Sequence, residues 1–187
     1  MGREGVPKES AASIQGEQVK GQHYGKFRGT VIDNVDPMLI GRLMVMVPDV
    51  SNIIPSTWAM PCLPFAGIQN GFYAVPEIGS GVWVEYEQGD PDYPIWTGCF
   101  FGTAAEPPAL AMATPPGLQC VVIQTIGQNT LMISDTPGPT GGILLKSQTG
   151  AMISISDTGI IISNGQGATI LMAGPSVTIN EGALEVI

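Results

Sequence analysis

The sequence predicts an all-β protein made of a small N-terminal barrel and a C-terminal β-helix that three identical chains build together. Glycine (25) and proline (16) are abundant and charged residues make up only 12%, so turn formers are dense and helix formers are scarce. About five strand-like runs fit between residues 25 and 102. From Leu118 onward a pair of apolar residues, separated by one position, recurs every 7 to 12 residues.

The N-terminal region divides into an arm and a barrel. Residues 1–22 are polar and mix both charge signs, so we expect a flexible or partner-ordered arm. Residues 23–103 are expected to form the barrel, a size and strand count that suit a small antiparallel closed sheet. Its first strands are predicted at Phe27–Asp33 and at Arg42–Val47, with a turn at Asp36-Pro37 between them.

Two later runs complete the predicted barrel. In the run from residue 82 to residue 87, Val82, Val84 and Tyr86 face one side, which is the alternation of a half-buried strand. The turn formers of residues 89–92 then precede a strand at residues 94–101.

A linker is predicted at residues 104–117, where Pro107-Pro108 and Pro115-Pro116 bracket an alanine-rich stretch. Diproline stiffens such a segment and disfavours both helix and central strand. Residues 118–187 form the predicted shaft, in which only a handful of charges remain.

The recurring apolar pairs of the shaft predict short strands that share one buried line of side chains. A strand with two inward residues cannot cover them alone, so either one chain coils into a solenoid or three chains each supply one wall of a triangular prism. About 70 residues give barely three solenoid turns with open ends, which favours the trimer. The parity at residues 160–162 and 170–172 stays open, since three apolar residues in a row fit either phase. The predicted trimer core comprises Val121, Ile123, Leu131, Ile133, Ile143, Leu145, Ile153, Ile155, Ile160, Ile162, Ile170, Met172, Val177, Ile179, Leu184 and Val186.

Charge and composition exclude several classes of function. A formal net charge of −9 repels a phosphate backbone, so nucleic acid is not an expected partner. No apolar run is long enough for a membrane-spanning helix and no signal peptide precedes the barrel, so assembly in the bacterial cytoplasm is expected. The three widely spaced cysteines, Cys62, Cys99 and Cys120, are expected to be buried and reduced.

An enzymatic function finds little support. Glu85 and Glu87 could imitate a carboxylate pair, but their spacing also describes an ordinary solvated strand face. A Ser-His-Asp triad is not expected, because the only histidine, His23, lies near the mobile arm. No phosphate loop, HExxH or CxxC motif is present. We predict no catalytic residue, metal site or cofactor.

Several segments of the barrel region resemble the phage baseplate assembly protein V and contractile-tail spike family, which includes the spike proteins of type VI secretion. The resembling segments are Gly29-Thr-Val, Asp36-Pro37, Gly41-Arg42-Leu-Met-Val-Met-Val-Pro48, Pro76-Glu-Ile-Gly79-Ser-Gly81-Val-Trp-Val-Glu-Tyr-Glu87 and Gly89-Asp90-Pro91-Asp92-Tyr93-Pro94-Ile-Trp96-Thr-Gly98. They occur in the family's order and cover most of residues 25–102. The motif positions are Gly41, Arg42, Gly79, Gly81, Gly89, Asp90, Pro94, Trp96 and Gly98.

The resemblance implies an oligonucleotide/oligosaccharide-binding (OB) barrel that serves as a trimerisation and docking collar. It also implies an intertwined triple-stranded β-helix in the tail baseplate of a virion or of a phage-like injection particle. The rod would be driven through the target cell envelope when a sheath contracts, with a baseplate hub protein on its tube side. The alternative function is a ligand- or oligosaccharide-binding OB module on a trimeric stalk, with the apolar segment Trp58–Phe72 as a binding loop.

Two departures from other family members refine this expectation. The linker leaves no room for the lysozyme domain that some members carry, so murein digestion is not expected. Others end in a His-x-His iron site, which this sequence lacks after His23. An apolar end invites capping. We therefore predict a separate Pro-Ala-Ala-Arg-repeat (PAAR) tip protein that contacts Glu185, Val186 and Ile187.

Overall fold

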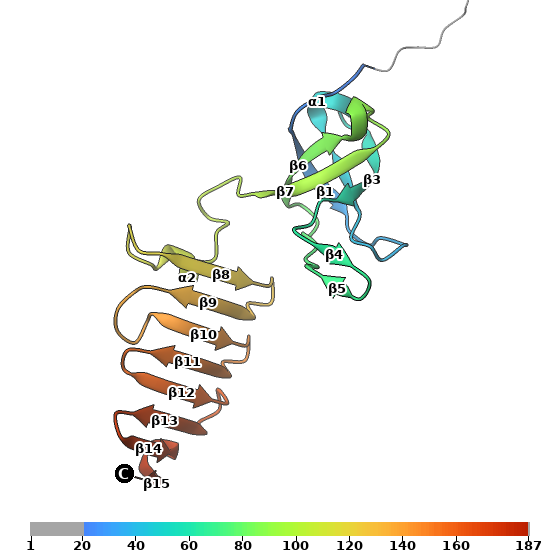
Figure 1. The fold of residues 1–187 in the computed structure, drawn as a ribbon. Coiled ribbons are helices and arrows are strands. Elements are labelled where there is room, and N and C mark those ends of the chain that lie inside the picture. The colour runs from blue at the N-terminus through green and yellow to red at the C-terminus, as the bar shows by residue number, and fades with distance from the viewer. Residues whose placement is uncertain (1–20, 187) are drawn as a thin grey trace, which may run out of the picture. The chain divides into compact units, whose positions relative to one another are not determined.

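A computed structural model describes residues 21–186, with only the backbone of Glu185 and Val186. The chain forms two compact units, one ending at Gly102 and the other beginning at Thr103 (Figure 1). Residues 1–20 of the predicted arm lie outside the described residues, as does Ile187 of the predicted tip contact.

The N-terminal unit is a closed five-stranded barrel (Figure 1). Four of its five strand pairs are antiparallel, and the barrel closes through a parallel pair between β3 and β7. A short helix, α1 (Pro48–Ser51), connects β2 to β3, and a 3₁₀ turn, η1 (Glu87–Gly89), follows β6. In barrel order the strands are β1 (Phe27–Asp33), β2 (Leu43–Met46), β3 (Pro55–Pro61), β7 (Pro94–Phe100) and β6 (Gly81–Tyr86).

Four of these strands lie where the alternating runs predict them. The fifth, β3, includes the start of the segment Trp58–Phe72 that we expected to be a loop. The rest of that segment contains a small hairpin made of β4 (Ala66–Gly67) and β5 (Asn70–Gly71).

The barrel core consists mainly of aliphatic side chains that alternate along the strands, together with Tyr86 and Trp96. Val82, Val84 and Tyr86 are buried, which confirms the predicted face of β6. Trp96 of β7 packs in the same cluster and donates its indole N–H to the Gly41 carbonyl oxygen at 3.0 Å. Because a buried indole N–H needs an acceptor, this bond fixes the β1–β2 loop against β7. The full core cluster is Val31, Leu43, Val45, Val47, Ala59, Val82, Val84, Tyr86 and Trp96.

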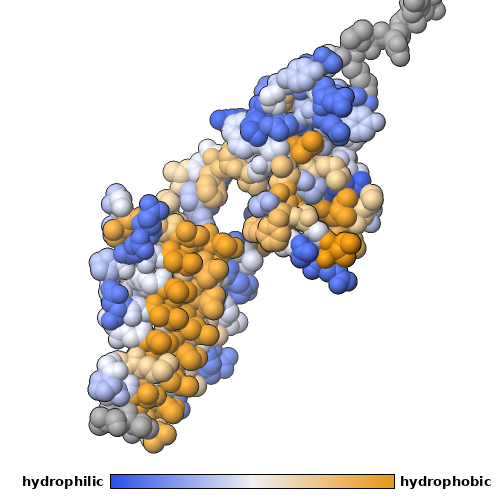
Figure 2. Space-filling view, in the orientation of Figure 1, coloured by the Kyte–Doolittle hydropathy of each residue, from blue (hydrophilic) through white to orange (hydrophobic). Residues whose placement is uncertain are grey.

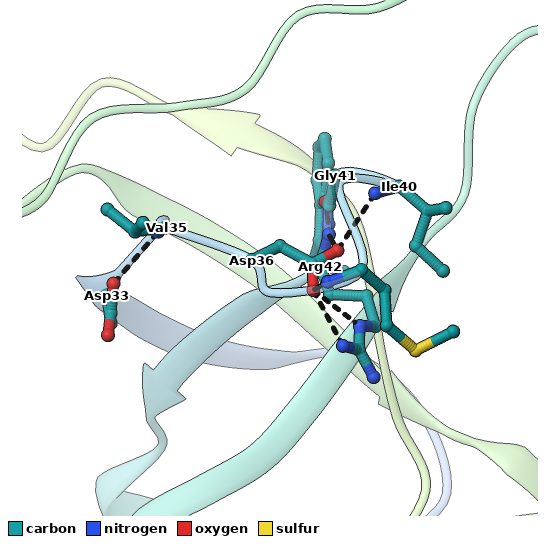
Figure 3. A network of polar contacts seen from close by, with 8 residues as sticks. Asp33, Val35, Asp36, Ile40, Gly41 and Arg42 are labelled. Atoms are coloured by element: carbon teal, nitrogen blue, oxygen red, sulfur yellow. Dashed lines mark hydrogen bonds and ion pairs between the residues drawn. The ribbon is translucent and has the colours of Figure 1, made fainter.

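The β1–β2 loop is organised around one buried carboxylate, Asp36 (Figure 3). Its oxygens accept the backbone N–H groups of Met38, Ile40 and Arg42 at 2.9 to 3.1 Å. The Arg42 guanidinium donates two further bonds to Asp36 Oδ1, at 2.9 Å from Nε and 2.6 Å from Nη2. Arg42 also lies 5.5 Å from the ring centre of Trp58 on β3. The sequence predicted only a turn here.

The C-terminal unit is one eight-stranded antiparallel sheet whose strands pair with their neighbours in chain order (Figure 1). The connections are short turns, and the last one contains a second 3₁₀ turn, η2 (Asn180–Gly182). The strands are β8 (Cys120–Gln124), β9 (Thr130–Ser134), β10 (Gly142–Lys146), β11 (Met152–Ser156), β12 (Gly159–Ser163), β13 (Thr169–Ala173), β14 (Ser176–Ile179) and β15 (Leu184–Val186).

Two local expectations were wrong. A one-turn helix, α2 (Ala109–Met112), lies inside the predicted linker, because Pro108 stands at its N-cap, where a missing N–H costs nothing. The cysteines are free but not buried, since Cys62 and Cys99 are exposed and Cys120 is half-buried. Their positions at the ends of β3 and β7 and on the edge strand β8 account for this exposure.

The ion pair at Asp36 predicts that the barrel loses stability in acid. The Arg42 guanidinium and the three backbone N–H donors hold the pKa of this carboxyl far below its usual range. A lowered folded-state pKa adds stability above the unfolded value of about 3.9, and this contribution disappears as the pH falls below it. Asp36→Asn should therefore lower the melting temperature at pH 7 by several degrees and flatten its decrease between about pH 4 and pH 2.

The matched control is Asp33→Asn, since Asp33 accepts a single hydrogen bond, from the Val35 N–H at 2.9 Å. Thermal unfolding followed by circular dichroism measures both variants. Equal melting temperatures for Asp36→Asn and the unsubstituted chain would contradict the assigned role of the loop.

Candidate trimerisation face of the shaft

The strand register of the shaft brings the sixteen predicted core positions onto one face. In an antiparallel pair, directly opposed residues share a face. One column of opposed residues runs through Val121, Ile133, Ile143, Ile155, Ile160, Met172, Val177 and the position of Val186. The second column runs through Ile123, Leu131, Leu145, Ile153, Ile162, Ile170, Ile179 and Leu184. We call these two columns the apolar face.

This register settles the parity that the sequence left open. Ile160 opposes Ile155 and Ile162 opposes Ile153, so the outer two residues of the Ile-Ile-Ile run join the apolar face. The middle residue, Ile161, opposes Ser154 on the other face. The two-residue turn at Asp157-Thr158 before Gly159 imposes this phase.

The apolar face is uncovered in the single chain. Space-filling shows a continuous hydrophobic stripe along the C-terminal unit (Figure 2). Ile123 is 58% exposed, and Leu145 in the middle of its column is still 47% exposed. A hollow of about 590 Å³ follows the second column, between Ile123 and Ile162. An exposed aliphatic surface of this extent marks an interface.

The opposite face is mainly polar at its margins. Ser, Thr and Gln occupy many of the strand ends, including Gln124, Thr130 and Ser163. Its central column does contain apolar side chains, but they are mostly half-buried, and Met132 is buried. The two faces therefore differ in how much apolar surface they leave to solvent.

Side-chain oxygens connect turns that lie two strands apart on the same edge of the sheet. Gly138 donates its N–H to Asp157 Oδ2 at 3.1 Å. On the other edge, the Gln148 N–H bonds Asn129 Oδ1 at 3.1 Å and the Thr169 N–H bonds Asn180 Oδ1 at 3.0 Å. Each bond links one turn to the next turn on the same edge, so these bonds oppose separation of the hairpins.

Glycine is required where a strand begins directly beneath a neighbouring carbonyl. A Cβ at Gly142 would lie 1.9 Å from the Ile155 oxygen, and one at Gly159 would lie 2.3 Å from the Met172 oxygen. Both glycines also have φ in the left-handed region, at +81° and +142°. These positions set the close spacing of the strands, and the repeat pattern alone did not reveal them.

The barrel motif positions serve the fold in the described structure. Arg42 and Gly41 belong to the Asp36 loop described above, and Trp96 bonds Gly41. The Phe100 ring lies over Gly81, where a Cβ would approach it to 2.7 Å. Asp90 Oδ1 accepts the Asp92 N–H at 3.0 Å in the β6–β7 turn, which leads into the buried Pro94. Gly79, Gly89 and Gly98 all have positive φ.

The residues weighed for catalysis do not form a reactive group. Glu85 pairs with Lys26 at 2.8 Å, whereas Glu87 lies beyond the end of β6 in η1. His23 contacts the rings of Phe27 and Tyr86 at 5.9 Å. Within residues 21–186, as far as their side chains are described, no three His, Cys, Asp or Glu residues gather as metal ligands. No helix in the described part of the chain is long and apolar enough to cross a membrane.

Two protein-family models match the two units. The type VI secretion system/phage-baseplate injector OB domain matches residues 27–101, which is the barrel from β1 to β7. The phage baseplate V C-terminal trimerisation domain matches residues 120–185, which is the shaft sheet. Together they account for most of the chain and for both of its units.

Curated relatives agree with these matches. The type VI secretion system spike protein VgrG3 of Vibrio cholerae serotype O1 (El Tor) is 36% identical over 114 residues, or 58% of this chain. The actin cross-linking toxin VgrG1 of a classical V. cholerae O1 strain is 45% identical over 53 residues, or 28% of this chain. The matched stretches span only 11% and 5% of those relatives.

An OB barrel followed by a trimerisation sheet defines a structural spike component of a contractile injection system. The chain belongs to the phage baseplate assembly protein V and contractile-tail spike family.

The apolar face predicts a sharp contrast between two adjacent substitutions on β11. Ile153→Asp places a carboxylate in the second column, so a trimer would have to bury three charges around its axis, at several kcal/mol each. Ser154→Asp adds the same charge on the other face. Sedimentation velocity should show a trimer for Ser154→Asp and loss of the trimer for Ile153→Asp. A stable Ile153→Asp trimer would show that this face is not the core.

Proposed function

We propose that the chain is the central spike of a contractile tail baseplate, in a phage or a phage-like injection device, and acts as a rigid homotrimeric rod driven through the target cell envelope. The observation that carries this proposal is the uncovered apolar face, because it requires further chains to cover it and these chains would form a rod. The family membership supports the same function.

Trimer formation has a sufficient driving force. Ten of the sixteen side chains of the apolar face are 36% to 58% exposed in one chain, and five others are half-buried. Completing their burial contributes about 1 kcal/mol each, which is on the order of 10 kcal/mol per chain. Association costs on the order of 4 to 15 kcal/mol, because the chains lose translational and rotational freedom. Burial of the apolar face is therefore of the size needed to drive the association of three copies.

The rod would work mechanically and would not catalyse a reaction. Its turns are short, and the backbone hydrogen bonds that Asp157, Asn129 and Asn180 accept connect them to one another. Its strands carry few charges, so little charge would have to leave water as the rod passes through a lipid layer. We propose that energy comes from the contracting sheath and that the chain has no enzymatic role.

The barrel is proposed to dock a baseplate hub protein on its tube side. Ile53 and Ile54 are 82% and 67% exposed in the β2–β3 connection. This connection lies at the end of the barrel opposite the β1–β2 loop, by the direction of the strands. An exposed aliphatic pair at that end suits a protein contact.

A separate PAAR-type tip protein is proposed at the far end of the shaft. In the described chain β15 pairs only with β14, so its other edge offers free backbone groups. Leu184 on this strand is 54% exposed. We propose that this tip protein contacts Glu185, Val186 and Ile187. Assembly of the particle in the bacterial cytoplasm is part of the same proposal.

The alternative as a sugar-binding module lacks suitable chemistry. The barrel does contain a hollow of about 410 Å³, but its walls are almost wholly apolar and Thr97 supplies the one side-chain hydroxyl. Sugar recognition needs several convergent polar groups.

Quantitative mass spectrometry of purified particles tests the proposal. Three copies of the chain per particle are expected, together with a tip subunit at about one copy. Deletion of the chain should leave particles that contract but no longer kill or inject, because the leading rod is absent. Particles that inject normally without the chain would refute the function, and intact particles without a tip subunit would refute the cap.

A further inference from the structure

The β4–β5 hairpin projects from the barrel (Figure 1). At its tip Ile68 is 94% exposed, and the flanking Phe65 and Tyr73 are 59% and 65% exposed. The base is held by the Phe72 N–H, which donates to the Phe65 carbonyl at 3.1 Å. Because the Ile68 side chain is almost fully exposed to water, it does not contribute to the packing of its own barrel.

An apolar hollow of about 410 Å³ opens beside the base of this hairpin. Leu63, Val75 and Trp96 line it, and the free thiols Cys62 and Cys99 stand in its wall. Ile68 does not fill the hollow of its own chain, since almost its whole surface is exposed. The same chain therefore offers an unfilled apolar hollow and an unburied apolar tip.

In a homotrimer the hairpin of one copy and the hollow of the next would be tethered to the same shaft. The segment between β7, which ends at Phe100, and β8, which begins at Cys120, ties each barrel to the common shaft. The hairpin and the hollow lie at the end of the barrel where the chain leaves β7, because they follow the end of β3. Tethering raises the effective concentration of neighbouring barrels to about the millimolar range.

We propose that Ile68 of each copy inserts into the hollow of the next copy, so that three head-to-tail contacts close a ring of barrels. A contact between the tip of one copy and the hollow of the next is heterologous, and it closes when the copies are related by a threefold rotation. The inference rests on the proposed homotrimer, and each hollow is completed only by a residue of its neighbour.

The native thiols of the hollow provide a direct test in the full chain. Ile68→Cys in a Cys120→Ser background should form disulfides with Cys62 or Cys99 of the next copy. The Cys99 side chain is exposed, but partial desolvation by its surroundings raises the pKa of its thiol, so oxidation with glutathione disulfide is carried out at alkaline pH. After heat denaturation without reductant, covalent dimers and trimers should replace most of the monomer band.

Two controls make the outcome specific. Ile53→Cys in the same background places a thiol at another highly exposed site, 82% exposed, at the other end of the barrel and should stay monomeric on the gel. Adding Cys62→Ser and Cys99→Ser to Ile68→Cys should abolish the covalent bands. Light scattering before oxidation separates the two proposals. A trimer that yields only monomer bands, or bands that persist without Cys62 and Cys99, overturns the ring contact alone. A monomer before oxidation overturns the homotrimer as well.

Discussion

The need to cover one aliphatic face determines most of the architecture. Two columns of branched side chains run through all eight strands of the shaft, and a single chain leaves them in water. A sheet with one such face cannot persist alone, and no other element among the described residues covers it. When three such sheets face a common axis, the apolar face of each sheet is covered by the other two. The short turns and the glycines at strand starts follow from this demand, since each strand must stack closely on the last.

The shaft was largely predictable because its pattern repeats. All sixteen predicted core positions fall in two columns, and their burial in a trimer stays a prediction until an assembly is observed. The sequence could not show which residues of the runs at Ile160 and Ile170 lie on the apolar face, since a run of three apolar residues fits both phases. The pairing of β12 with β11 decided the first, and the pairing of β13 with β12 decided the second. The hydrogen bonds that Asp157 and Asn129 accept were also missed, because they join residues 19 positions apart and leave no periodic signal.

The barrel was predictable in its strands but not in its connections. Alternation indicated β6 and its buried residues, whereas β3 was obscured by prolines at both ends and by the apolar loop that follows it. Asp36 looked like a turn former and proved to be a buried, charge-paired centre for the β1–β2 loop. Burial of that carboxylate depends on Arg42 and on Gly41 meeting Trp96, 55 residues away. The motif residues of the family thus serve mainly to position these loops.

Multi-angle light scattering of the purified chain tests the central claim most directly. The chain mass is 19.5 kDa, and the covered apolar face predicts one species at three times that mass, unchanged by dilution over a wide range. A monodisperse monomer that remains soluble would contradict the account, because it would show that the aliphatic columns are stable in water without partners.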